Sequence, residues 1–122
     1  MSTNATELSR STAEKGDAFM DAIAAGRLAE SLRQWRGERV YIHLEVNPGA
    51  YWRSGSAILD EAHVKGDGPY RVFLELDGWT SLIQIDQLTH MELSAELIIA
   101  TAYDEHERLA RTILISRAPF SL

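Results

Sequence analysis

The stretch Arg39–Val46 reads Arg-Val-Tyr-Ile-His-Leu-Glu-Val, with apolar and polar side chains in alternation. Successive side chains of a β-strand point to opposite faces, so this pattern buries one set of side chains and leaves the other outside. The buried set is Val40, Ile42, Leu44 and Val46. Asn47-Pro48-Gly49 follows directly and is typical of a turn. The stretch therefore predicts a strand with one face against a core.

Short segments of the same kind continue to the C-terminus, with turn residues between them. The glycine-containing run Lys65-Gly66-Asp67-Gly68-Pro69 predicts a turn, and Asp77-Gly78 is typical of a tight hairpin. After the first strand, we predict strands at 56–64, 70–76, 79–85, 88–93, 96–103 and 108–117.

Upstream of the first strand, apolar residues between 17 and 35 have helical spacing. They form two groups, Phe19 with Ile23, then Leu28 with Leu32 and Trp35. The second group is shifted by about half a helical turn from the first, which predicts a break at Gly26. Gly37 stands where a left-handed cap would end the helix.

These elements predict a mainly β fold, α+β by content: a small antiparallel β-barrel-like meander with an N-terminal helical segment. The meander either closes, or nearly closes, into a barrel or stays an open sheet with the helix across its apolar face. Residues 1–12 are rich in Ser, Thr and Asn and are expected to be a disordered leader. The expected domain is 13–122, with the helical segment at 13–36 and the β body at 38–118.

Composition excludes several classes of function. The 122 residues have a net charge of -6 and no cysteine, which excludes disulfides, cysteine-bound zinc and thiol nucleophiles. The negative charge disfavours nucleic acid and anionic membranes as partners. Neither a membrane span nor a secretory signal is found, so we expect a cytoplasmic protein.

Two His/Glu pairs are the sharpest chemical candidates. His43 shares a strand face with Glu45, and His63 shares one with Glu61. If the strands were neighbours, His43, Glu45 and His63 could bind a metal or act as acid and base. The alternative is that they are solvent-facing polar positions on half-buried strands.

A second candidate site combines aromatic and cationic side chains. These side chains are expected at strand ends, where they could line a barrel mouth that binds a small anionic molecule; they are Trp52, Arg53, Tyr70, Arg71 and Trp79. Alternatively, Tyr70 and Trp79 fill the barrel core. No catalytic residue and no cofactor is assigned, because nucleophile and phosphate-loop motifs are missing.

Several motifs resemble those of the bacterial YojF family, in matching order from about Leu28 to the C-terminus. They are Val40-Tyr41-Ile42-His43-Leu44-Glu45, Gly66–Val72 with Gly78-Trp79, Leu88-Thr89, and Ile115-Ser116-Arg117-Ala118-Pro119-Phe120. The resemblance implies a barrel-like fold and unknown function, with no catalytic residues to carry over. In bacilli the gene of this family lies beside that of a zinc-dependent deacetylase that acts on a glucosamine-malate precursor of bacillithiol. The resemblance therefore suggests an accessory or regulatory partner of such an enzyme.

The first hypothesis is a non-enzymatic accessory protein that binds itself, and also a metabolic enzyme, through an exposed strand face or a loop at Tyr51–Arg53. Homo-oligomers are expected because Leu59, Phe73 and Leu82 fall on nominal outer faces, unless the helix covers them. The alternatives are a barrel that binds an anionic metabolite, and an enzyme with a His/Glu metal site.

Overall fold

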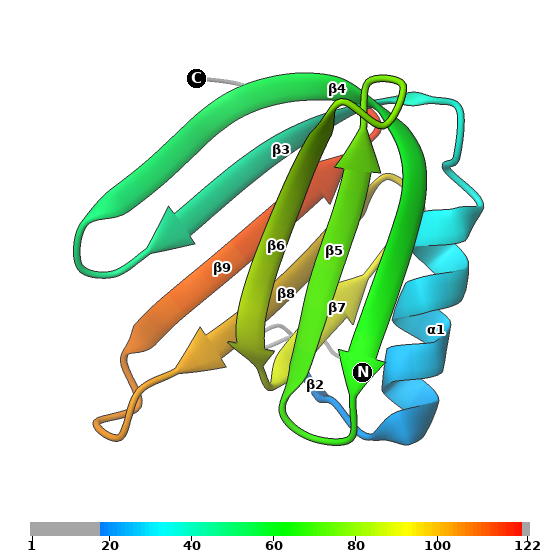
Figure 1. The fold of residues 1–122 in the computed structure, drawn as a ribbon. Coiled ribbons are helices and arrows are strands. Elements are labelled where there is room, and N and C mark those ends of the chain that lie inside the picture. The colour runs from blue at the N-terminus through cyan, green and yellow to red at the C-terminus, as the bar shows by residue number, and fades with distance from the viewer. Residues whose placement is uncertain (1–17, 121–122) are drawn as a thin grey trace, which may run out of the picture.

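Residues 18–120 are described by the structure, a computed structural model, except for the side chain of residue 54. They form an open eight-stranded antiparallel sheet and one helix, α1 (Figure 1). The sheet order is β2-β7-β8-β9-β3-β4-β5-β6. The bounds are β2 Ala18–Phe19, α1 Ala22–Arg33, β3 Arg39–Val46, β4 Ala50–Gly66, β5 Tyr70–Leu76, β6 Ser81–Leu88, β7 His90–Leu93, β8 Leu97–Tyr103 and β9 Leu109–Ser116.

The long strand β4 gives the molecule its two layers. Its first half pairs with β3 as far as Ile58, and its second half pairs with β5 from Leu59 onward. Register shifts in both ladders let β4 bend between these halves. The first layer is therefore β2, β7, β8, β9, β3 and the first half of β4. The second layer is the other half of β4 with β5 and β6, and Figure 1 shows it in front of β8 and β9.

The core lies between these two layers. Alternate residues of the longer strands are buried there, and eight of the fully buried side chains are Val40, Ile42, Leu59, Leu74, Leu76, Ile98, Ile113 and Ile115. The buried set of β3 agrees with the predicted alternation at Val40 and Ile42, whereas Leu44 and Val46 are only half-buried near the strand's free end. Leu59 is completely buried, which corrects its expected place on an outer face.

The sheet is open: its two edges are β2 and β6, and the consecutive strands β6 and β7 do not pair. Every other consecutive pair from β3 to β9 is hydrogen-bonded, and β3 pairs with β9. Around Thr89, just before β7, Met20 N donates to Thr89 O at 2.7 Å, and Thr89 N donates to Thr101 O at 2.8 Å. Because β2 and β8 take the two sides of this segment, β6 finds no free edge there. The mainly β fold is confirmed, while the barrel is not closed.

Helix α1 contacts β4 and β7, and Figure 1 shows it beside the second half of β4. Asp21 caps its N-terminus, with Oδ1 accepting a hydrogen bond from Ala24 N at 2.8 Å. The helix buries Ala25, Leu28 and Leu32. It runs unbroken through Gly26, so the predicted break is wrong.

The two apolar groups have a different explanation from a broken helix. Phe19 belongs to β2, and Ile23 is 72% exposed on α1. The shift between the two apolar groups therefore arises because Phe19 belongs to β2 and not to α1. Gly37 does adopt a left-handed conformation, with φ +83°, after the turn that buries Trp35. The expected leader at 1–12 lies outside the described residues.

Two further details bear on the candidate sites. Tyr51–Arg53, expected as a loop, lies inside β4, where Tyr51 and Trp52 pair with Glu45 and Leu44 of β3. The predicted hairpin at Asp77-Gly78 is present, with φ of 54° and 72° at these two residues. Asp77 Oδ1 accepts a hydrogen bond from Ile58 N at 2.9 Å, which fixes this turn against the bend of β4. In the part of the chain described, no helix has the length and apolar character to cross a membrane.

Candidate functional site

His43 and Glu45 lie together on the side of β3 that faces away from the core. His43 Nε2 is 3.3 Å from Glu45 Oε1, and Asn47 Nδ2 donates to Glu45 Oε2 at 2.8 Å. The hydrogen bond from Asn47, followed by the one from His43, holds the pKa of Glu45 below its ordinary value. Glu45 is therefore held in a polar network on β3 that favours its charged form.

His63 lies on the other layer, on the outward side of the second half of β4. Its Nε2 is 2.7 Å from Glu75 Oε2 on β5, while Glu61 interacts with Arg36 at 3.1 Å. The bend in β4 thus carries His63 to the opposite side of the molecule from His43 and Glu45. Among residues 18–120, no three His, Asp or Glu side chains gather as a metal site would require. The structure does not bring the three candidate metal ligands together.

The five aromatic and cationic candidates are also spread over the molecule. Trp52 and Arg53 are on the first half of β4, and the Arg53 guanidinium lies 5.1 Å from the centre of the Tyr51 ring. Tyr70 and Trp79 flank opposite ends of β5, whose seven residues span roughly 20 Å. Arg71 is exposed and stacks on Phe73 at 5.6 Å. These side chains do not line one mouth.

Only one of the two residues considered for the core is buried. Tyr70 is 5% exposed, whereas Trp79 is 60% exposed in the turn between β5 and β6. Trp52 is 40% exposed and its indole lies over Gly55, where a Cβ atom would collide with the ring. The missing side chain of Gly55 therefore leaves room for the Trp52 indole over β4.

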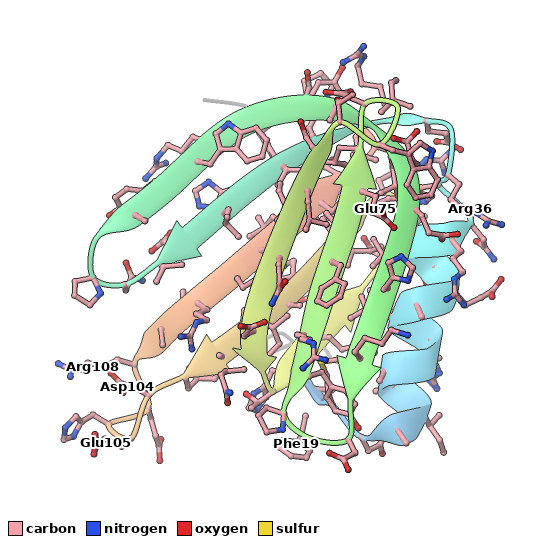
Figure 2. The ribbon with its side chains drawn as sticks, in the orientation of Figure 1. Phe19, Arg36, Glu75, Asp104, Glu105 and Arg108 are labelled. Carbon is pink, nitrogen blue, oxygen red and sulfur yellow. The ribbon has the colours of Figure 1, made fainter. Side chains whose placement is uncertain are left out.

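A hollow lies between α1 and the β4–β5 hairpin and is called here the helix–hairpin groove. Its volume is about 730 Å³. Small residues of α1 form one wall and the hairpin forms the other; they include Ala22, Ala25, Gly26 and Ala29, with Gly66 and Tyr70 opposite. Phe19 and Arg33 line its ends (Figure 2 labels Phe19). Of the sequence candidates, Tyr70 alone reaches it.

This groove was missed from the sequence because its walls are far apart in the chain. A signal was nevertheless present: Ala22, Ala25, Gly26 and Ala29 follow the spacing of one helix face. Small residues on one face leave the helix backbone open to close approach. The pattern predicts a contact only once the position of the hairpin is known.

A second hollow of about 550 Å³ lies between the β3–β4 and β8–β9 loops. Asp104 and Arg108, labelled in Figure 2, form part of its lining. Asp104 accepts hydrogen bonds from the backbone N–H groups of His106 and Arg108, at 2.8 and 3.0 Å. These bonds, that of Arg108 first, lower the pKa of Asp104, so its carboxylate is occupied in shaping its own loop.

Comparisons with known proteins agree with this architecture. The family model described as "Protein of unknown function (DUF1806)" matches residues 22–120. "Uncharacterized protein YojF" of Bacillus subtilis (strain 168) is 30% identical over 119 residues, which cover 84% of this chain and 100% of that protein. The crystal structure of the Bacillus subtilis YojF protein matches with a TM-score of 0.77 and 26% identity, covering 88% of this chain and 100% of that one.

Proposed function

The chain belongs to the DUF1806 family, whose function is unknown, and we propose that it is a non-enzymatic cytoplasmic accessory protein that binds a metabolic enzyme. The resemblance to the YojF family inferred from the sequence motifs is confirmed. The proposed docking surface is the helix–hairpin groove and the exposed apolar side chains beside it.

The exposure of Ile23 and Phe19 carries this proposal. They are 72% and 68% exposed, the largest values among the large hydrophobic side chains of the described residues. Phe19 lines the groove, and Ile23 lies on the first turn of the helix that forms its wall. An apolar patch next to a concave surface favours burial against another protein.

The groove wall supports the same proposal. Ala22, Gly26 and Ala29 have little or no side chain, so a partner residue can enter between α1 and the hairpin. Buried anchors of this kind contribute most of the binding energy at protein interfaces. Asp67 and Arg33 supply polar groups at the rim.

The partner that we propose is the bacillithiol-pathway deacetylase that the family resemblance suggests. The groove itself specifies an apolar anchor with a polar rim and does not specify which enzyme carries it. Titration calorimetry with that purified deacetylase therefore tests the surface and the partner separately.

A matched pair of substitutions at Gly26 makes the test sharp. A Cβ at Gly26 meets nothing within 4 Å, so alanine fits there, and because Gly26 lines the groove a leucine side chain extends into it. Gly26→Ala should bind like the wild type, whereas Gly26→Leu should weaken binding by about tenfold or more. Leu82→Asp, a change at a 60% exposed residue of β6, should have no effect. Equal binding by all variants would remove the groove as the docking site, and no heat of binding would remove the deacetylase as the partner.

The size of the groove favours a second candidate, the binding of a small anionic molecule. Its volume of about 730 Å³ lies in the range of ligand pockets, roughly 300 to 1,000 Å³. Arg33 lines it and can pair with a carboxylate, while Asp21 and Asp67 line the same groove and Glu61 Oε1 lies 3.8 Å from Arg33 Nε. Malate-like acids should then raise the unfolding temperature of the wild type but not of Arg33→Ala. An unchanged unfolding temperature in the wild type would exclude these acids.

A further inference from the structure

The side of the first layer that faces away from the core is called here the outer face. It carries two rows of side chains. Residues that lie directly opposite one another in the paired strands β7, β8, β9 and β3 form these rows across the sheet. The first row is His90, Thr101, Thr112 and Glu45. The second row is Glu92, Ile99, Leu114 and His43.

The centre of the outer face has unsatisfied groups. Thr101 and Thr112 are each 6% exposed, and within residues 18–120 their Oγ1 atoms have no hydrogen-bond partner. Ile99 and Leu114 lie beside them and are half-buried. A sheet face in contact with water normally presents solvated polar groups, whereas the centre of this one combines apolar groups and unpaired hydroxyls.

Each row has a histidine at one end and a glutamate at the other, and the two rows have them in opposite order. The first row begins with His90 and ends with Glu45, and the second begins with Glu92 and ends with His43. Rotation by 180° about an axis along the strands, between β8 and β9, reverses each row. In a face-to-face pair this rotation places Glu45 of a second copy opposite His90, and its His43 opposite Glu92.

We infer that the outer face binds the same face of a second copy of this chain about that two-fold axis. Ile99 of each copy then meets Leu114 of the other, and Thr101 meets Thr112. Rotation about χ1 brings each hydroxyl to the interface, where the opposing threonine can accept or donate a hydrogen bond. Aligned packing of two twisted sheets permits this arrangement.

A contact between Glu92 and His43 cannot form within one chain. Glu92 and His43 lie on β7 and β3, which are three strand spacings apart, about 14 Å. His43 instead contacts Glu45 of its own strand at 3.3 Å. A contact between Glu92 and His43 can therefore form only between two copies of the chain.

Sedimentation velocity of the full chain over a range of concentrations tests the inference. We expect a concentration-dependent dimer for the wild type, and a monomer for Leu114→Glu, which places a charge against Ile99 of the other copy. Leu82→Glu, on the second layer, should dimerise like the wild type. A wild type that is monomeric throughout, or a Leu114→Glu variant that still forms the dimer, would overturn the inference.

A charge exchange separates the interface from a simple loss of folding. His43→Glu should raise the dimer dissociation constant by about tenfold, because it faces Glu92 of the other copy at two equivalent places. Adding Glu92→Lys in the same chain should restore the wild-type value. Because these positions are too far apart to interact within one chain, failure of the double variant to recover would count against the two-fold arrangement.

Discussion

The two halves of β4 belong to one strand but have opposite surroundings. In the second half, Leu59 and Ala62 are fully buried, because their side chains belong to the core between the layers and α1 packs beside this half. In the first half, Tyr51 and Trp52 are 62% and 40% exposed, and β3 is the partner strand. The difference shows that backbone pairing alone does not make a core. A second layer is needed to cover the side chains, and the bend in β4 supplies it.

The largest expected effect is the loss of a core side chain in the second half. Leu59→Ala should lower the free energy of unfolding by about 2–5 kcal/mol, because it removes a fully buried side chain and leaves a cavity. Tyr51→Ala in the first half should change it by about 0.5 kcal/mol or less. Urea denaturation measures both values. Equal losses would show that both halves contribute to one core.

Gly55→Ala tests the packing of the first half. The added Cβ collides with the Trp52 indole, so this 40% exposed ring must shift, and we expect a loss of about 1 kcal/mol in unfolding free energy and a shift in tryptophan fluorescence. In a Trp52→Ala background the same change should cost much less. Additive losses would mean that the indole does not set the requirement for glycine.

Asn47→Ala tests the polar network next to the first half. It removes hydrogen bonds to Glu45 Oε2 and to Leu109 O, which should cost about 1 kcal/mol of stability. The pKa of Glu45 should also rise toward its ordinary value, because Asn47 is the main cause of its lowering.

The sign of the pH dependence follows from that lowering. Since the pKa of Glu45 is lower in the folded state, its contribution is present above the unfolded pKa and is lost as pH falls through the folded pKa. Asn47→Ala should therefore weaken this loss of stability in acid. Carboxyl titration by NMR measures the pKa directly, and an unchanged value would contradict the proposed cause.

Arg36→Ala should have the smallest effect, and it sharpens the contrast with Glu45. The Arg36–Glu61 pair is half-exposed on the arginine side, so its removal should cost about 0.5 kcal/mol or less. The pKa of Glu61 should stay below its ordinary value, because its main cause is the hydrogen bond from the backbone N–H of Ala62. A return of the pKa of Glu61 to its ordinary value would assign the lowering to Arg36 instead.

Local sequence patterns predicted those elements whose conformation depends on residues close together in the chain. The strand Arg39–Val46 has its predicted bounds because its side chains alternate regularly, and the Asp77-Gly78 hairpin follows from residues that tolerate positive φ. The first half of β4 was missed because Tyr51–Arg53 lacks that alternation, and its strand conformation comes from pairing with β3. The separation of Phe19 from α1 likewise depends on its pairing with His90.

The candidate sites required information that spacing does not contain. His63 pairs with Glu75, not Glu61, because the register of β4 and β5 brings Glu75 close. His43 and His63 both lie at outward-facing strand positions, but the bend in β4 puts them on opposite sides of the molecule. The helix–hairpin groove depends on α1 packing beside β4, which no local motif in either element indicates.

The pairing of β3 with β9 has a consequence for synthesis of the protein on the ribosome. This ladder alone joins the β3–β6 hairpins to the β2–β7–β8–β9 group. The hairpins of β3 to β6 can form as they emerge, since each strand pairs with the one made just before it. The other group cannot be attached until Leu109–Ser116 has been translated. A nascent chain interrupted before that point would carry two sets of strands with no ladder between them, each with an exposed edge for chaperones or proteases to bind.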